Sequence, residues 1–319
     1  IFRHPNLSSN EVKERDAPCR LPRRPRGLIV CPRRNRTRRL REIAKPMPTK
    51  NEREYVLGTN DEELVRLGFQ HRVWGEYAYA IWERAGFAPG QTILDVGCGP
   101  GFAALDLARL VGSTGRVIAV DESARFLEHL NGQLRAQGVG NVETVLADVQ
   151  SLGLPAESVD GAYARWVLCF VRDPQAVVAA VAAALRSGGV FAVQDYFNYR
   201  AVTLAPRSTI FAKVIDAVEQ SWRRPGGDPD IVARLPAIMR GCGLELREIR
   251  PIARTARPGS ALWNWPTTFF RTYVPALVGM GLLTAADQSA FEEDWARRSK
   301  DPYTFFCTPP VYDVIAVKC

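Results

Sequence analysis

The chain has 319 residues, 46% of them hydrophobic and 24% charged, which is the composition of a globular protein with a full core. Its net charge of +8 comes from residues 1–46, which hold 14 Lys and Arg against 4 Asp and Glu, so the remainder is slightly acidic. A slightly acidic body lacks the basic face of a nucleic-acid-binding protein. The longest uncharged stretch, residues 272–286, is also shorter than the about 20 apolar residues that span a bilayer. We therefore expect neither a nucleic-acid partner nor a membrane span.

The seven cysteines are scattered along the chain, without a C-x-x-C pair and without a His/Cys cluster at zinc spacing. This pattern predicts that the protein holds no metal ion. It also indicates reduced thiols, and we therefore expect a cytoplasmic location.

Residues 1–46 show little apolar periodicity and carry several prolines among their arginines, so we expect them to be disordered. An RNA-binding arm and an organelle-targeting peptide are two interpretations, although three acidic residues are unusual in a targeting peptide. A third interpretation is upstream sequence translated by mistake, because the chain opens on Ile1 and its first methionine is Met47. The functional domain is then residues 47–319, and a protein that starts at Met47 is expected to be fully active.

Residues 60–83 have the apolar spacing of an amphipathic helix. Gln70 and Trp74 are four residues apart and share a face of that helix, and His71 lies beside Gln70. Because the helix precedes the first predicted strand, we expect residues 55–90 to form a helical cap over a ligand cleft. Simple packing against the sheet is an equally open interpretation of Gln70 and Trp74.

The segment from Ile93 to Phe102, with the sequence ILDVGCGPGF, combines a buried strand, an acid and a glycine-rich loop. Glycine has no Cβ, so a loop with three glycines turns tightly and lets a ligand contact backbone N–H groups. A dinucleotide fingerprint, G-x-G-x-x-G, would place its last glycine at Phe102 and therefore does not fit. The pattern D-x-G-x-G-x-G favours another nucleoside-bearing ligand, and a glycine-rich turn without a ligand is the alternative.

Two further predicted strands end in carboxylates. Residues 115–121 end in Asp121, 20 residues after Gly101, where a carboxylate can accept hydrogen bonds from ribose hydroxyls. Residues 141–148 form a third strand that ends in Asp148. Each acid alone is equally compatible with a helix N-cap. The spaced series favours a nucleoside ligand without phosphate, because a phosphate would call for a nearby Lys or Arg.

This series of strands, glycines and acids resembles the class I S-adenosylmethionine (SAM) dependent methyltransferases, whose first motif has the form D-x-G-x-G-x-G. The resemblance covers residues 55–318 and is most specific over residues 93–195. It extends to the broad group that includes ubiquinone/menaquinone C-methyltransferases and natural-product methyltransferases. The resemblance implies SAM as the cofactor, bound by Tyr55, Gln70, Trp74, Asp95, Gly97, Gly99, Gly101, Asp121, Glu122, Asp148, Val149 and Arg165.

Strands and helices continue to alternate after the third strand, with strands four and five expected over residues 158–166 and 189–195. Such alternation predicts an α/β fold, a Rossmann-like seven-stranded mostly parallel sheet with helices on both faces. The remaining core elements are expected as helices over residues 207–222 and 229–240, a sixth strand over 244–254 and a seventh over 310–317.

About 55 residues separate strands six and seven, where the resembled family has a short hairpin, so we expect a helical insertion there. Helices are predicted near residues 269–280 and 284–298. The insertion is rich in aromatic residues, which supply flat apolar contact area for a substrate, although a local mini-core is the alternative. The expected segments are a SAM-binding core over residues 91–255, a substrate cap over 256–309 and the last strand over 310–319.

Methyl transfer from a sulfonium requires mainly that nucleophile, methyl and sulfur be aligned, and a base is needed only when the nucleophile must lose a proton. Asp195 and Tyr196, at the end of strand five, are the first catalytic candidates. His71 is the one histidine expected to reach the cleft. The aromatic residues expected to bind the substrate are Trp166, Tyr199, Trp263 and Trp265.

We therefore expect a SAM-dependent methyltransferase that moves a methyl group to an O, C or N atom of a hydrophobic small molecule by in-line displacement. Residues 160–163 lack the D/N-P-P-Y/F motif of amino-directed DNA and RNA enzymes, which again disfavours a nucleic-acid substrate. Two alternatives stay open. One is an NAD(P)-dependent oxidoreductase, which the glycine register opposes, and the other is a SAM-binding protein without turnover.

Overall fold

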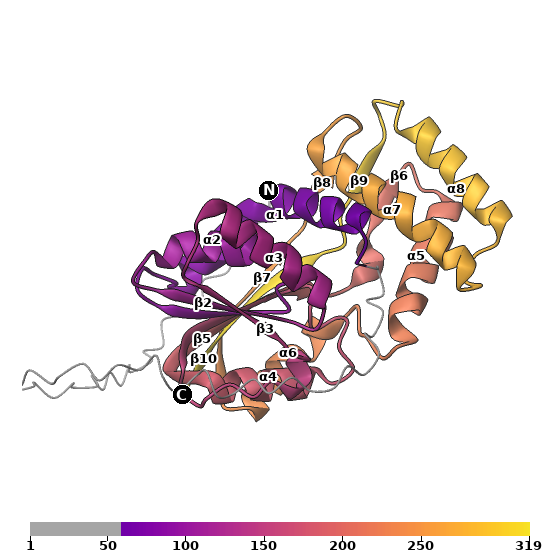
Figure 1. Cartoon of the computed structure of the whole chain (residues 1–319). Coiled ribbons are helices and arrows are strands. Elements are labelled where there is room, and N and C mark those ends of the chain that lie inside the picture. The colour runs from indigo at the N-terminus through magenta and orange to yellow at the C-terminus, as the bar shows by residue number, and fades with distance from the viewer. Residues whose placement is uncertain (1–58) are drawn as a thin grey trace, which may run out of the picture. The chain divides into compact units, whose positions relative to one another are not determined.

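The computed structural model describes residues 59–319, so Tyr55 and the basic segment of residues 1–46 lie outside the described range. Its main sheet has seven strands in the order β3-β2-β1-β4-β5-β10-β7 (Figure 1). Strands β1 to β5 are parallel to one another, and β10 is antiparallel to both β5 and β7. The strands are β1 (Thr92–Val96), β2 (Arg116–Asp121), β3 (Val142–Leu146), β4 (Val159–Arg165), β5 (Leu185–Tyr196), β7 (Leu244–Ile252) and β10 (Val311–Lys318).

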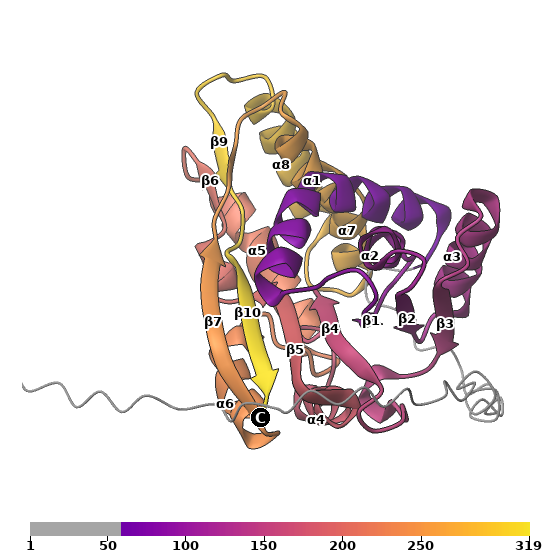
Figure 2. The ribbon, with the colours of Figure 1, turned by 90° about the vertical axis from the view of Figure 1, so that its left-hand side faces the viewer.

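Helices cover both faces of this sheet, as Figure 2 shows from one edge. One face carries α1 (Asp61–Ala85), α2 (Phe102–Val111) and α3 (Ala124–Gln137). The other carries α4 (Pro174–Ala184) and α6 (Leu235–Gly241). This confirms the predicted seven-stranded, mostly parallel α/β fold.

The central strands form the core because both of their faces are buried. Ile93, Leu94 and Val96 of β1 have no exposed surface, and Phe191 and Val193 of β5 are equally buried. Continuous apolar runs of this kind are typical of parallel strands that lie between two helix layers. At the carboxyl ends of these strands the polypeptide leaves the core as loops, and those loops carry the polar residues singled out above.

The helical insertion contains α7 (Ala261–Gly279) and α8 (Ala285–Arg298), and α7 begins well before the expected residue 269. Ser260 is its N-cap, accepting a hydrogen bond from the backbone N–H of Trp263. Pro266 removes one hydrogen bond inside the helix, which is why the sequence pattern places the helix start too late. Burial of Leu262 and Trp265 holds the first turns in place.

A second, three-stranded sheet accompanies the insertion and is not predicted by the sequence patterns. Its order is β6-β9-β8, with β6 at Thr203–Ala205, β9 at Phe305–Cys307 and β8 at Thr255–Ala256. These strands are too short to show a periodicity of their own. Helix α5 (Thr209–Arg223) follows β6 and packs against α7 and α8.

The expected helix over residues 229–240 is instead a 3-10 turn, η5 (Ile231–Ala233), followed by α6. Among residues 59–319 no helix is long and apolar enough to cross a membrane. In the same range no group of three or more His, Cys, Asp or Glu side chains is arranged to hold a metal ion.

Candidate functional site

A cavity of about 620 Å³ lies at the carboxyl ends of β1, β2 and β4. The strand order reverses between β1 and β4, and ligands of open α/β sheets bind at such a point. We call it the sheet-edge cavity. Its walls include Asp95, residues 97–100, 121–123, 148–150 and 165–167, and Gln70 and His71 of α1.

The three motif glycines have positive φ angles but different surroundings. At Gly99 an added Cβ would meet nothing within 4 Å, and this residue lines the sheet-edge cavity. At Gly97 a Cβ would approach Val167 Cγ2 to 2.7 Å, and at Gly101 it would approach Leu130 Cδ1 to 2.3 Å. Gly101 is the N-cap of α2 and is not among the lining residues, so its role is to pack the helix start.

Asp121 connects the end of β2 to the glycine loop. The backbone N–H of Gly99 donates to Asp121 Oδ2 at 2.8 Å, and that of Ser123 donates to Oδ1 at 2.9 Å. Burial raises the pKa of Asp121, and these backbone hydrogen bonds oppose the shift. A carboxylate has about four lone-pair sites, so Asp121 can still accept hydrogen bonds from ligand hydroxyl groups in the cavity. Glu122, the next residue, lines the cavity too.

Asp148 does not end β3, which stops at Leu146. It is the N-cap of the 3-10 turn η3 (Val149–Ser151), because its side chain accepts the backbone N–H of Gln150 at 2.8 Å. The N-cap interpretation considered for these acids therefore applies here. Asp148 and Val149 nevertheless both line the sheet-edge cavity.

Asp95 and Arg165 each contribute a buried polar atom that has no hydrogen-bond partner among the described residues. These atoms are Asp95 Oδ2 and Arg165 Nη1, and both residues line the sheet-edge cavity. Asp95 is 2% exposed, and burial raises its pKa to about 7 although the Arg165 charge opposes the shift. An unpaired buried polar group costs about 1–3 kcal/mol, so such a pair in one cavity points to a ligand that carries both a donor and an acceptor.

His71 connects Arg165 to helix α2. Its Nδ1 lies 2.8 Å from Arg165 Nη2 and its Nε2 lies 2.9 Å from Asp106 Oδ2. A guanidinium only donates, so Nδ1 accepts and Nε2 carries the proton, which makes His71 neutral. Burial lowers the pKa of His71, in keeping with this state. With both ring nitrogens engaged, His71 positions Arg165 and does not have the free nitrogen of the expected base. Sequence patterns carry no signal for the partner, Asp106.

Asp195, the other expected base, does not line the sheet-edge cavity. Its side chain has no exposed surface, with Oδ1 accepting the backbone N–H of Tyr196 at 2.9 Å and Oδ2 that of Cys169 at 3.2 Å. Burial raises the pKa of Asp195 to about 6, and these hydrogen bonds oppose the shift. The carboxylate thus fastens the loop after β4 to the end of β5, which is a structural role.

A smaller pocket of about 50 Å³ adjoins the sheet-edge cavity, and we call it the aromatic pocket. Arg66, Gln70, Trp166 and Phe170 are among the residues that line it, and no sequence pattern indicates Arg66 or Phe170. Two expected residues lie elsewhere. Trp263 stacks on Trp295 at a centroid distance of 4.8 Å within the insertion, and Trp74 packs edge-on against Trp166 and Trp265 without lining either pocket. Of the expected substrate residues, Trp166, Tyr199 and Trp265 line the aromatic pocket, and the catalytic candidate Tyr196 lines it too.

Comparison with known proteins shows that residues 94–193 match the family model described as a methyltransferase domain. The chain contains a methyltransferase domain. The matched residues run from β1 through β5 and include the glycine loop, Asp121 and Arg165. The methyltransferase domain thus supplies most of the sheet-edge cavity. The comparison lends no support to the oxidoreductase alternative.

Curated relatives match part of the chain. The chain is 42% identical over 105 residues to a 2-phytyl-1,4-naphtoquinone methyltransferase of Nostoc sp., covering 33% of this chain and 44% of the relative. It is 31% identical over 147 residues to a ubiquinone/menaquinone biosynthesis C-methyltransferase of Shewanella halifaxensis, covering 46% of this chain and 55% of the relative. The chain thus spans about half the length of these relatives.

Among solved structures, the YcgJ protein from Bacillus subtilis matches with a TM-score of 0.54 and 17% identity, covering 76% of this chain and 98% of that one. At this identity the likeness is one of fold. It extends well beyond the matched methyltransferase domain and supports the same strand arrangement.

Proposed function

We propose that the protein binds SAM in the sheet-edge cavity and transfers its methyl group to a C, O or N atom of a hydrophobic small molecule. The observation that carries this proposal concerns Asp95 Oδ2 and Arg165 Nη1, two buried atoms of opposite character without a partner among the described residues, on two residues that line one cavity. An α-amino acid group has an ammonium for the carboxylate and a carboxylate for the guanidinium. SAM carries such a group at one end.

The nucleoside end of SAM fits the other wall of the cavity. Gly99 leaves the backbone open to a ligand, because an added Cβ there would enter free space. Asp121 would hold the ribose hydroxyls with its remaining lone pairs, and Glu122 lies beside it. Asp148 and the buried side chain of Val149 would contact the base. Gly97 packs closely against Val167, which leaves no room for a Cβ at this position of the loop.

When bound, SAM supplies an electrophilic methyl group on a sulfonium. The chain's residues then have to hold the acceptor in line with it, and such alignment can contribute roughly 7–11 kcal/mol to lowering the barrier. The aromatic pocket lies next to the sheet-edge cavity and shares Gln70 and Trp166 with it, so it is the natural place for the acceptor. The names of the curated relatives, which include a naphthoquinone methyltransferase, support a hydrophobic ring-bearing acceptor.

Cysteines Cys98, Cys169, Cys242, Cys307 and Cys319 are unpaired. We therefore infer a reducing compartment and propose a cytoplasmic location. We also propose that the acceptor is not a nucleic acid, because the charge of the chain outside residues 1–46 is slightly acidic.

Isothermal titration of the full chain with SAM and with its demethylated product tests the proposal. We expect one ligand per chain, and we expect Asp95→Asn and Arg165→Gln each to weaken binding by about 10- to 100-fold, the effect of losing one charge-assisted hydrogen bond. Arg125→Gln is the matched control, because the partner of Arg125 among the described residues is the exposed Asp61. The absence of binding heat in a folded protein, or a change in NADH fluorescence on titration, would contradict the proposal.

A labelled-methyl screen over phenols, quinones and fatty acids then separates an enzyme from a SAM-binding protein without turnover. Transfer to a member of one class identifies the acceptor type. Tight binding of SAM with no transfer to any of these compounds would favour the non-catalytic alternative.

A further inference from the structure

The aromatic pocket lies where a methyl acceptor would bind, so its lining restricts the chemical class of that acceptor. This inference rests on the proposed function. The pocket shares Gln70, Trp166 and Phe170 with the sheet-edge cavity. A molecule in the aromatic pocket would therefore lie directly beside a molecule in the sheet-edge cavity. The two pockets together form the space in which donor and acceptor would meet.

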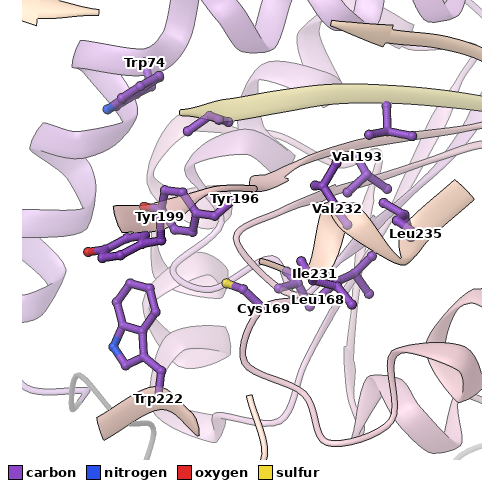
Figure 3. Close-up of a cluster of buried hydrophobic side chains, with 14 of the residues drawn as sticks. Trp74, Leu168, Cys169, Val193, Tyr196, Tyr199, Trp222, Ile231, Val232 and Leu235 are labelled. Atoms are coloured by element: carbon purple, nitrogen blue, oxygen red, sulfur yellow. The ribbon is translucent and has the colours of Figure 1, made fainter. Parts of the chain in front are cut away.

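Several rings around this pocket are nearly parallel. Trp265 and Trp166 are inclined by 20° at a centroid distance of 6.3 Å, and Trp166 and Tyr196 by 24° at 6.1 Å. Tyr196 and Trp222 continue the series at 27° and 5.9 Å, and Figure 3 shows Tyr196 and Tyr199 together with the indole of Trp222 near them. Parallel faces favour a flat ligand, which can stack on them.

The size of the pocket limits the ligand to one ring. Its volume of about 50 Å³ is well below the roughly 150 Å³ of an engineered cavity that binds benzene. A single ring thus enters only with some adjustment of the lining side chains. The rest of a larger acceptor would extend into the sheet-edge cavity.

The aromatic pocket has no unbalanced charge among the described residues. Among residues 59–319, Arg66 is the one charged residue that lines the aromatic pocket. Glu63 holds that guanidinium in a two-point pair, with Arg66 Nε and Nη2 each 2.6 Å from a Glu63 oxygen, and both side chains are almost completely buried. A charged acceptor would lose its hydration in this pocket without gaining a counter-charge, which is costly.

Two residues that line both pockets, Gln70 and Trp166, carry N–H groups without an acceptor among the described residues. Gln70 Oε1 accepts from Arg66 Nη1 at 3.0 Å and from Trp265 Nε1 at 2.9 Å, and because both of these groups only donate, the orientation of the amide is set. Its Nε2 therefore presents two N–H groups, for which no acceptor is found among residues 59–319. The buried Nε1 of Trp166 likewise has no partner in that range. A ligand oxygen that reaches these N–H groups would supply the acceptor that they lack.

The backbone of Trp166 gives an independent indication that its position matters. Its φ is +52°, in the left-handed region that a bulky residue rarely adopts, at the point where the chain leaves β4. Backbone strain of this kind costs about 1–3 kcal/mol and is found preferentially at functional sites. In this conformation the indole stacks on both Trp265 and Tyr196, and Trp166 lines both pockets.

We propose that the acceptor is an uncharged aromatic compound with a ring oxygen substituent, such as a phenol or aryl ketone, whose oxygen accepts hydrogen bonds from Gln70 Nε2 and Trp166 Nε1. These two residues select for the oxygen and the parallel rings select for the flat ring. Diphosphates, carboxylates and amines are not accommodated in the aromatic pocket.

Binding of three small probes to the full chain, saturated with the demethylated product of SAM, tests this assignment. The probes are 4-fluoroacetophenone, 1-ethyl-4-fluorobenzene and 4-fluorobenzoate, which share one ring and differ in carrying a carbonyl, no oxygen or a charge. A titration monitored by fluorine NMR gives the Kd of each probe. We expect the ketone to bind about tenfold more tightly than the ethyl compound, as expected for one or two neutral hydrogen bonds, and the benzoate to bind most weakly.

Two variants identify the donors. Gln70→Glu keeps an acceptor oxygen for Arg66 and Trp265 but has no N–H, and Trp166→Phe keeps a flat ring but has no indole nitrogen. In each we expect the preference for the ketone to fall to about threefold or less, while binding of the ethyl compound changes little. Trp82→Phe is the matched control, because Trp82 Nε1 is also buried and unpartnered in the described chain but Trp82 lines neither pocket. This control should retain the full preference.

Equal binding of the ketone and the ethyl compound, tightest binding of the benzoate, or an unchanged preference in both variants would overturn the assignment. Titration with the demethylated product on the same samples keeps this outcome separate from the proposed function. If that product binds and the probes show no preference for oxygen, only the acceptor class is refuted. If the product itself does not bind, the proposed function fails first.

Discussion

The carboxylate of Asp95 is buried, and its Oδ2 atom has no hydrogen-bond partner among the described residues. Burial raises its pKa to about 7, while the nearby Arg165 charge lowers it and Asp121 raises it. The side chain is therefore held near the midpoint of its titration at neutral pH. An ammonium group in the sheet-edge cavity would stabilise the ionised form, and this links cofactor binding to the proton on Asp95.

This linkage predicts a pH dependence of SAM affinity. Only the ionised Asp95 attracts an ammonium, and with a pKa of about 7 the ionised fraction rises about tenfold between pH 6 and pH 8. We expect the Kd for SAM, measured by titration calorimetry, to fall by about that factor over this range. In Asp95→Asn the affinity should be lower and almost independent of pH. A pH-independent affinity in the unsubstituted protein would contradict the linkage.

The same pKa predicts an effect on stability with a definite sign. The folded protein binds the Asp95 proton more tightly than the unfolded chain, whose Asp titrates near 3.8, so the unfolding free energy decreases as pH rises from about 4 to about 7. The contribution is fully present below pH 4 and lost above pH 7. Urea unfolding at several pH values should show a shallower decline in Asp95→Asn, and an equal decline in both proteins would refute the assignment to Asp95.

At the scale of elements, the turn from β1 into α2 shows that glycines in one motif serve different purposes. Gly101 has φ +84° and its missing Cβ leaves room for Leu130 of α3, so it joins two helices. Gly99 has φ +54° and faces the sheet-edge cavity, so it leaves room for a ligand. The motif therefore combines a packing requirement with a binding requirement.

These two glycines can be separated by substitution. Gly101→Ala should lower the unfolding free energy by about 2–3 kcal/mol, because it combines an unfavourable φ with a collision with Leu130. Gly99→Ala meets no protein atom and should cost only about 1 kcal/mol, yet it should weaken SAM binding clearly because its methyl group enters the cavity. Urea unfolding and calorimetry measure the two quantities. The reverse order of stability effects would show that the turn is organised differently.

At the scale of the whole described molecule, α1 connects the two halves of the main sheet. Near its end, Arg84 Nε donates to Glu248 Oε1 of β7 at 2.8 Å, and Arg84 also pairs with the buried Asp313 of β10. The middle of the same helix brings Gln70 and His71 to the pockets. The position of these two side chains therefore depends on how α1 is fastened to the last strands.

Arg84→Met tests this connection. It leaves Asp313, a side chain with 3% exposure, without its positive partner, so we expect the unfolding free energy to fall by about 2 kcal/mol. Arg125→Met is the control, since its pair with Asp61 is 48% and 89% exposed and should contribute less than about 1 kcal/mol. Both values come from urea unfolding. Equal effects of the two substitutions would mean that α1 is held mainly by its apolar contacts.

Much of the core was predictable from local patterns. Apolar runs that alternate with helical segments predict the parallel sheet, and the glycines and Asp121 predict a ligand at its carboxyl edge, because these features depend on residues close together in the chain. The small sheet of β6, β8 and β9 was not predictable, since its strands have two or three residues and join segments far apart in sequence.

The sequence by itself therefore determined the fold class and the place of the site, because backbone periodicity and turn chemistry are local properties. Only the tertiary structure decided the roles of individual side chains. His71 engages Arg165 and Asp106, Asp195 faces inward to the loop after β4, and Gln70 lies between the two pockets. Each of these depends on contacts between elements distant in sequence, and such contacts decide which side chains have exposed donors and acceptors and which have theirs already paired.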